Sequence, residues 1–133
     1  MDLRLAADIL EEVTEHAKSV YPKEGCGLLA GRQTAERFIP MMNAASRLTE
    51  YEMDAAELIA TLRGLRRTGE HLVAIYHSHP NGPAEPSQTD IERAYYPEAA
   101  HLIVSLAEPE RPRAAAFRII DGEVIPIELH VIV

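Results

Sequence analysis

The sequence predicts a mixed α/β domain in which a β-sheet is flanked by helices. Two segments, residues 6–20 and 55–67, carry apolar residues at helical spacing, and short apolar runs typical of strands lie between and after them. Asp121-Gly122, between two such runs, is a strong signal for a hairpin turn. A chain of 133 residues suits one core, so we expect residues 1–133 to form a single domain.

The first half of the chain predicts one helix followed by strands. The helix over 6–20 presents apolar positions such as Ile9 and Val13 to a sheet, and Pro22 ends it. Two strands and a possible short third one are predicted over 25–31, 36–43 and 49–53. Pro40 cannot donate a backbone hydrogen bond, which implies an edge strand or a bulge.

The second half begins with a helix over 55–67, which Asp54 caps and Gly69 is expected to end. Four further strands are predicted over 71–77, 101–106, 114–120 and 123–132. Between the first two of them, proline and glycine make 80–86 a loop, and Ser87 starts a short helix that ends before Pro97.

Composition narrows the function classes. A net charge of −8 argues against a general nucleic-acid binder, which needs a basic face. No apolar run approaches the roughly 20 residues of a membrane span, and the N-terminus lacks the features of a signal peptide. The one cysteine, Cys26, cannot form an internal disulfide, so we expect a reducing, cytoplasmic location.

The segment after residues 72–76 carries the chemistry. His77 and His79 end a predicted strand, share one of its faces, and have α-carbons expected about 6.6 Å apart at a rise of roughly 3.3 Å per residue. With Asp90 they supply two imidazoles and a carboxylate, a donor set typical of catalytic zinc. The alternatives are a pair of polar residues at a strand end and, for Ser87 and Asp90, a helix-capping pair; the capping and metal interpretations are compatible.

This pattern resembles the JAMM motif of the MPN+ metalloproteases, written Glu…His-x-His-x7-Ser-x2-Asp. His77, His79, Ser87 and Asp90 fit its second part, and Glu24, in the context Glu-Gly-Cys-Gly, fits the first. The resemblance implies a single MPN domain, a mixed sheet flanked by helices whose architecture is similar to that of cytidine deaminases. It also implies Zn²⁺ held by the two histidines and the aspartate.

The resemblance assigns roles to the remaining two residues. Glu24 is implied as the general base that takes a proton from the attacking water, and Ser87 as a stabiliser of the oxyanion. Without the resemblance, Glu24 would be read as an exposed acid in a loop. The implied reaction is hydrolysis after the Gly-Gly tail of a ubiquitin-like or sulfur-carrier protein, as in small prokaryotic members.

Two other classes of function fit the sequence less well than this enzyme. A non-catalytic MPN-type scaffold that binds proteins usually lacks a ligand, whereas this chain retains all of them, and a purely structural zinc leaves Glu24 without a role. A zinc deaminase needs His-x-Glu and Pro-Cys-x-x-Cys motifs, which are absent.

The remaining cysteine, histidine and tyrosine residues are expected to have structural roles. Cys26 is expected to be a small buried residue rather than a nucleophile. The histidines without ligand spacing are read as surface or strand-end residues, and three tyrosines as core or rim residues or as the lining of a substrate groove: His16, His71, His101 and His130, and Tyr76, Tyr95 and Tyr96.

Overall fold

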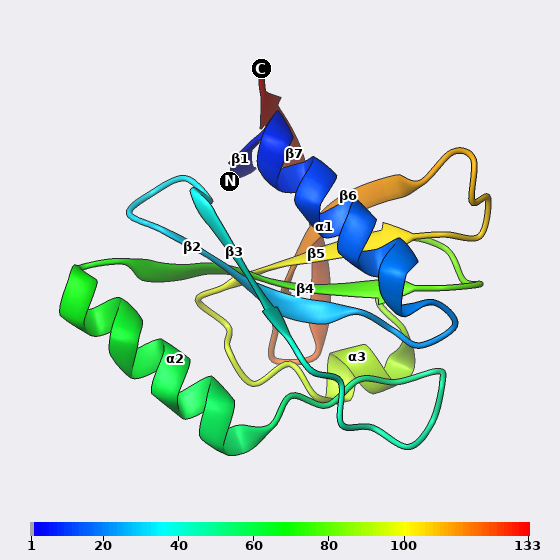
Figure 1. The fold of residues 1–133 in the computed structure, drawn as a ribbon, viewed down its shortest axis with the longest axis horizontal. Helices are drawn as coiled ribbons and strands as arrows, with labels where there is room; N and C mark the ends of the chain where they lie inside the picture. The colour runs from blue at the N-terminus through cyan, green and yellow to red at the C-terminus, as the bar shows by residue number, and fades with distance from the viewer. Residues whose placement is uncertain (1) are drawn as a thin grey trace.

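The computed structural model describes residues 2–133 and contains one seven-stranded mixed sheet with three helices (Figure 1). The elements are β1 (Asp2–Ala6), α1 (Ala7–Val20), β2 (Cys26–Gly31), β3 (Arg37–Met41), α2 (Ala55–Thr68), β4 (His71–His79), α3 (Gln88–Glu92), β5 (Ala100–Ser105), β6 (Arg113–Ile120) and β7 (Glu123–Ile132). Their order across the sheet is β1-β7-β6-β5-β4-β2-β3.

The helix α1 covers one face of the sheet. Its buried residues Ile9, Val13 and Ala17 are spaced four apart, so they form a single apolar stripe. This stripe packs in a core cluster with Leu3 and Leu5 of β1 and with alternate residues of the central strands. Among residues 2–133, no helix has both the length and the apolar character needed to cross a membrane.

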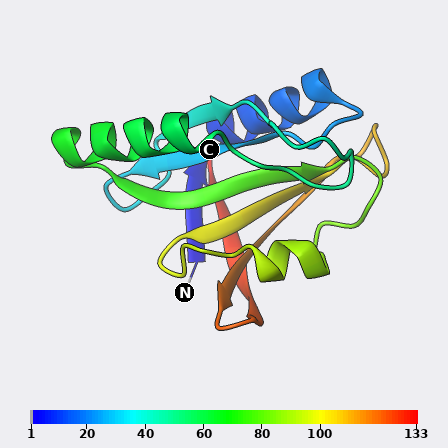
Figure 2. The same ribbon diagram turned by 90° about the horizontal axis from the view of Figure 1, so that it is seen from below.

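The opposite face is covered by α2 and by the segment around α3. A second core cluster there contains Cys26, Leu28 and Ile75 from β2 and β4, against which Leu58 and Leu62 of α2 pack. Figure 2 shows α3 and α1 on opposite sides of the sheet. The alternation of strand side chains therefore sends neighbouring residues into two separate cores.

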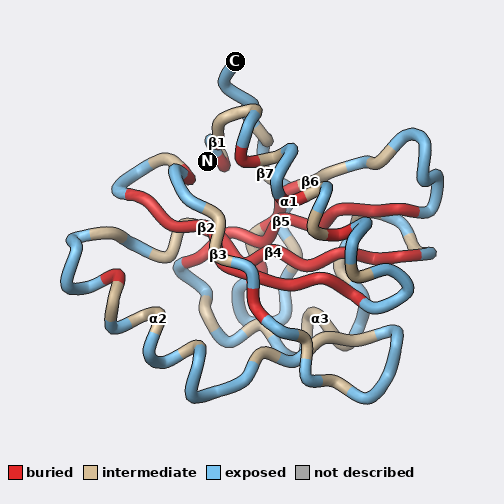
Figure 3. Tube along the Cα trace, in the orientation of Figure 1, coloured by how far each residue is buried: buried red, intermediate tan, exposed pale blue. Residues whose placement is uncertain are grey.

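Strand β4 lies inside the sheet, and its last residues carry the predicted metal ligands. It pairs antiparallel with β2, placing Cys26 opposite His77, and parallel with β5, placing Ile103 beside His77. Figure 3 shows that burial is concentrated along β2, β4 and β5. The two histidines consequently emerge from a strand that is held on both edges.

The N-terminal segment differs from the prediction. Residues expected only to lead into the first helix form β1, which pairs parallel with β7, Asp2 opposite Glu128. Leu3 and Leu5 alternate with polar or small residues and are almost completely buried. Because β7 is far from β1 in the sequence, no local sequence pattern predicts the pairing of these two strands.

The other elements follow the predicted order with small shifts of their ends. The possible strand over 49–53 is reduced to an isolated bridge between Asn43 and Met53. Pro40 lies in β3, which is an edge strand of the sheet, as expected. The hairpin turn between β6 and β7 is also confirmed, because Asp121 and Gly122 both adopt the positive φ values, 51° and 79°, that the tightest hairpin turns require.

Candidate metal centre

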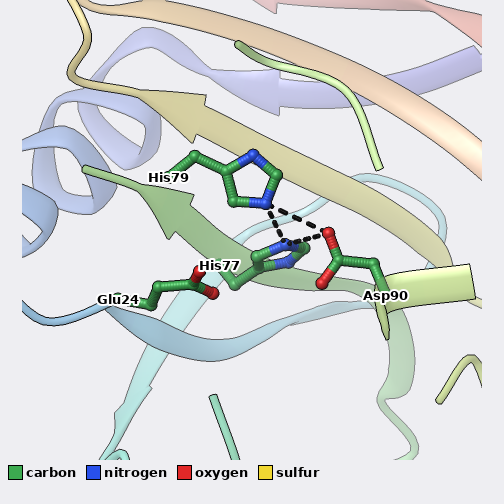
Figure 4. Close-up of side chains that lie close together, drawn as sticks. All are labelled: Glu24, His77, His79 and Asp90. Carbon is green, nitrogen blue, oxygen red and sulfur yellow. Dashed lines mark hydrogen bonds and ion pairs between the residues drawn. The ribbon is translucent and has the colours of Figure 1, made fainter. Parts of the chain in front are cut away.

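Four predicted site residues converge at the C-terminal end of β4. One ligand atom each from Glu24, His77, His79 and Asp90 lies within 4.8 Å of the others. Figure 4 shows the two carboxylates approaching the imidazoles from opposite sides. Glu24 comes from the segment just before β2, the histidines from β4, and Asp90 from the first turn of α3. The fold thus joins residues from three separate parts of the chain.

Asp90 is placed by a capping box at the start of α3. The Ser87 hydroxyl accepts a hydrogen bond from the Asp90 backbone N–H at 3.1 Å, and the Ser87 N–H donates to Asp90 Oδ2 at 2.9 Å. The same Oδ2 lies 3.0 Å from the Nε2 atoms of both His77 and His79. The capping reading of Asp90 is confirmed, and it is compatible with a role as a metal ligand.

The imidazoles present their Nε2 atoms to a common point. These two nitrogens lie 3.0 Å apart. The Nδ1 of His79 lies 2.8 Å from the Pro83 carbonyl oxygen, which fixes Nδ1 as the protonated nitrogen and leaves the Nε2 lone pair free to bind a cation. The loop over 80–86 consequently sets the tautomer of His79.

The donor set fits a divalent metal ion. Three ligand atoms stand 3.0 Å from one another, and tetrahedral zinc with bonds of about 2.0–2.2 Å needs a spacing of roughly 3.3–3.6 Å, so a slight outward shift suffices. Mixed nitrogen and oxygen ligands of this kind suit zinc. Glu24 Oε1, which is buried and has no hydrogen-bond partner within residues 2–133, is a further sign of a cation site.

Electrostatics give the two carboxylates different protonation behaviour. Burial works to raise the pKa of Asp90, but the hydrogen bonds with His77 and His79 outweigh it and hold that pKa well below its ordinary value. Burial raises the pKa of Glu24 from 4.5 to about 7, with the negative charges of Asp90 and Glu50 adding to the rise and His79 opposing it. Asp90 is therefore ionised at neutral pH, while Glu24 can exchange a proton there.

The histidines also differ from each other. Burial lowers the pKa of His77, which is 1 % exposed, and keeps its ring neutral. Burial also acts to lower the pKa of His79, but the hydrogen bonds to Asp90 and to the Pro83 carbonyl are stronger and raise it overall. Because metal ligands must be unprotonated, acid will release a metal ion from this site.

Tyr51 belongs to the site, although the sequence gave no reason to select it. Its ring stacks on His77 with centroids 4.6 Å apart and planes inclined by 23°. The His77 Nδ1 is buried and has no hydrogen-bond partner within residues 2–133, so it lacks the anchor that His79 has in Pro83. Stacking by Tyr51 takes the place of that anchor in holding the His77 ring.

A pocket of about 410 Å³ opens beside Asp90. Its floor includes Leu28 and Ile75 from β2 and β4. Tyr95 and Tyr96 line it, which supports their reading as groove residues, whereas Tyr76 is wholly buried in the first core. The four candidate ligand residues therefore lie beside a pocket that is largely apolar.

The structure agrees with the prediction for Cys26 but not with the prediction that His101 lies at the surface. Burial raises the pKa of the Cys26 thiol to about 12, which suits a buried packing residue and not a nucleophile. His101 lies near the start of β5, but the reading of it as a surface residue is wrong: it is 3 % exposed, and its Nε2 has no hydrogen-bond partner within residues 2–133. Burial lowers its pKa to about 4.

The comparisons with known proteins agree with this geometry. Residues 6–120 match the family model described as prokaryotic homologs of the JAB domain. The chain belongs to this family. Its members are hydrolytic metalloenzymes, in keeping with the convergence of Glu24, His77, His79 and Asp90.

Two relatives of this JAB-family chain have informative names. A CysO-cysteine peptidase of Mycobacterium tuberculosis (strain H37Rv) is 37 % identical over 133 residues, covering 98 % of this chain and 91 % of that protein. A probable TtuB-protein conjugate cleaving protease of Thermus thermophilus is 51 % identical over 87 residues, covering 65 % of this chain and 59 % of that protein.

Solved structures support the predicted fold. A protein from Desulfitobacterium hafniense, solved in solution, matches with a TM-score of 0.86 and 33 % identity over 98 % of this chain and 92 % of that one. A JAB1/MPN domain protein from Archaeoglobus fulgidus matches with a TM-score of 0.65 and 20 % identity over 96 % and 99 % of the two chains. The MPN fold expected from the motif is confirmed.

Replacing Tyr51 tests its role in holding His77. Tyr51→Ala should weaken zinc binding about 10-fold, the lower end of the effect of losing a group that orients a metal-bound histidine. Tyr51→Phe, which keeps the stacked ring, should bind zinc as the wild type does. Affinity can be measured by competition with a chromophoric chelator, and Asp90→Ala, which lacks a ligand, marks the lower limit. Equal affinities in Tyr51→Ala and wild type would contradict the role.

His101 predicts a pH dependence of stability. As the pH falls below about 6.5, the unfolded chain protonates His101 while the folded chain resists until about pH 4, so folding loses stability across that window. At pH 5 the loss is about 1–2 kcal/mol relative to pH 7. Urea unfolding at both pH values should show a smaller difference for His101→Leu than for wild type. The exposed His71→Leu is the control, and an equal difference in all three proteins would exclude this origin.

Proposed function

We propose that this chain is a zinc-dependent isopeptidase that hydrolyses the amide bond after the C-terminal Gly-Gly of a ubiquitin-like or sulfur-carrier protein. The observation that carries the proposal is the convergence of Glu24, His77, His79 and Asp90, whose ligand atoms lie within 4.8 Å of one another. The contrast between the two carboxylates agrees with it. Asp90 is held ionised by two imidazoles, whereas Glu24 has a pKa of about 7 and an unpartnered oxygen facing them. A carboxyl group whose pKa lies near neutral pH is suited to act as a general base.

His77, His79 and Asp90 would hold the zinc ion. When bound there, zinc supplies Lewis acidity, which lowers the pKa of water towards 7 and polarises a carbonyl oxygen. Glu24 accepts the proton from the water as the water oxygen attacks the carbonyl carbon, and it returns that proton to the amine when the C–N bond breaks. The products are the carrier, ending in a free carboxyl group, and the released amine.

Ser87 is proposed to stabilise the oxyanion. Its oxygen accepts the Asp90 N–H, which leaves the hydroxyl proton available to donate. The capping box fixes the position of this hydroxyl at the helix start, next to the ligand that it supports. A donor fixed in advance costs no reorganisation when charge develops.

The names of the relatives support the class of substrate. One is called a peptidase of CysO-cysteine and the other a protease that cleaves TtuB-protein conjugates. We propose that the present chain likewise acts on a carrier conjugate and that it does so in the cytoplasm. We further propose that residues 1–133 form a single domain whose architecture is similar to that of cytidine deaminases. A glycine tail suits an approach of backbone to a buried site, because it has no side chains to exclude.

The substitution Glu24→Gln separates an enzyme from a binding scaffold. It keeps the size of the side chain but removes the base, so turnover of a carrier conjugate should fall at least ~10²-fold while zinc content and thermal stability are kept. Intact-mass measurement of the products gives the rate. The exposed Glu36→Gln, at the far end of β2, is the control. Unchanged turnover in Glu24→Gln would assign the base elsewhere, and absence of turnover in wild type would favour the scaffold.

The substrate is tested with two conjugates that differ in one residue. A carrier ending in Gly-Gly should be cleaved, and the same carrier with its final glycine changed to valine should be cleaved at least ~10²-fold more slowly, because the branched side chain displaces the carbonyl from the attacking water. A free tetrapeptide should react poorly, since it offers little contact to offset its ordering. Equal cleavage of both conjugates would refute the specificity for glycine.

A further inference from the structure

The Glu24 side chain has no anchor of its own. The residue is 4 % exposed, and its Oε1 makes no hydrogen bond within residues 2–133. A glutamate side chain has several rotatable bonds, so an unanchored carboxylate is aimed mainly by its backbone and by packing. What fixes the backbone at Glu24 therefore governs how the proposed base meets the water.

One peptide group, between Glu24 and Gly25, is held at both of its polar ends by side chains. The Asn43 Nδ2 donates to the Glu24 carbonyl oxygen at 2.9 Å, and the Gly25 N–H donates to the Ser78 hydroxyl oxygen at 2.7 Å. The Ser78 backbone N–H also donates to the Gly25 carbonyl at 2.9 Å. Neither Asn43 nor Ser78 belongs to the ligand set, yet Ser78 stands between the two histidines.

Asn43 reaches further than this one carbonyl. Its Nδ2 also donates to the Glu50 carbonyl at 3.2 Å, and its Oδ1 accepts the N–H groups of Ala45 and Glu52 at 2.9 and 3.0 Å. The Asn43 amide therefore donates two hydrogen bonds and accepts two, which is its full hydrogen-bonding capacity. One side chain thus ties the Glu24 backbone to the loop that carries Tyr51 over His77.

Gly25 packs too closely against its neighbours to carry a side chain. A Cβ at this position would collide with the Tyr76 hydroxyl, and it would lie 3.1 Å from His16 Nδ1. Both of those side chains belong to the α1 side of the sheet, where Tyr76 is completely buried. Gly25 therefore lies directly against these two side chains, while Asn43 and Ser78 bind the polar ends of the peptide group.

We propose that Asn43 and Ser78 are positioning residues for Glu24, which they aim by clamping the Glu24–Gly25 peptide group. This inference rests on the proposed function, because it assigns the two residues to the placement of its general base. They touch neither substrate nor metal. Loosening the clamp should reduce kcat and leave KM nearly unchanged, since it misdirects the base without altering how the substrate is bound.

The clamp itself is tested in the metal-free protein by amide hydrogen exchange. The Gly25 N–H should exchange at least ~10-fold faster in Ser78→Ala and in Asn43→Ala than in wild type, because each change frees one end of the peptide group. Thr14→Ala, which removes a hydroxyl bonded to the Leu10 carbonyl in α1, should leave the Gly25 rate unaltered. Equal Gly25 exchange in all four proteins would overturn the clamp.

Asn43→Asp separates the clamp from the loop. The aspartate keeps an acceptor for the N–H groups of Ala45 and Glu52 but loses the donor to the Glu24 and Glu50 carbonyl groups. If Asn43 served only to hold the N–H groups of Ala45 and Glu52, aspartate would restore activity lost in Asn43→Ala. We expect no such rescue: both variants should show kcat lowered about 10- to 100-fold, with KM and zinc content near those of wild type.

A double-mutant cycle links the clamp to the base. In the Glu24→Gln background, Asn43→Ala should reduce the residual rate by less than twofold, whereas in wild type it costs about 10-fold or more, because residues that act as one unit are not additive. Additive losses would show that Asn43 acts otherwise than through Glu24. Absence of turnover in wild type on every conjugate would count against the proposed function alone, since Gly25 exchange still decides the clamp.

Discussion

Burial of ionisable groups at the end of β4 is the constraint on which the site depends. His77, His79 and Glu24 are each less than 10 % exposed, where a charge is costly unless it is paired. Asp90 supplies the pairing for both imidazoles through one oxygen, and its helix cap keeps that oxygen in place. A cation entering this space gains ligands already stripped of water and already oriented, which is why the surrounding polar network is extensive.

Much of the site could be predicted because its residues lie close together in the chain and carry local signals. His77 and His79 share a strand face by alternation, and the Ser-x-x-Asp spacing marks both a helix start and the third candidate ligand. The turn at Asp121-Gly122 and the edge position of Pro40 are likewise fixed by the conformations these residues allow. Glu24 was selected only by the family resemblance, since nothing local distinguishes it from the other acids.

What escaped prediction depends on contacts between distant parts of the chain. Tyr51 and Asn43 lie in an irregular loop whose path is set by side-chain hydrogen bonds to backbone, and such bonds have no periodic signature. His101 could have been suspected, because it interrupts an apolar run in a strand that is buried on both faces. The sequence does not say which face its ring enters, and so its closeness to His77 was not foreseen.

The parallel pairing of β1 with β7 has a consequence for the order of assembly. It joins Asp2 to Glu128, so closing it confines nearly the whole chain in one loop, whereas β2, β4 and β5 pair over shorter separations. Loop-closure entropy delays the most distant contacts, although it grows only slowly with length. The strands that carry the metal ligands can therefore come together first, and the edge formed by the two chain ends closes around a sheet that already exists.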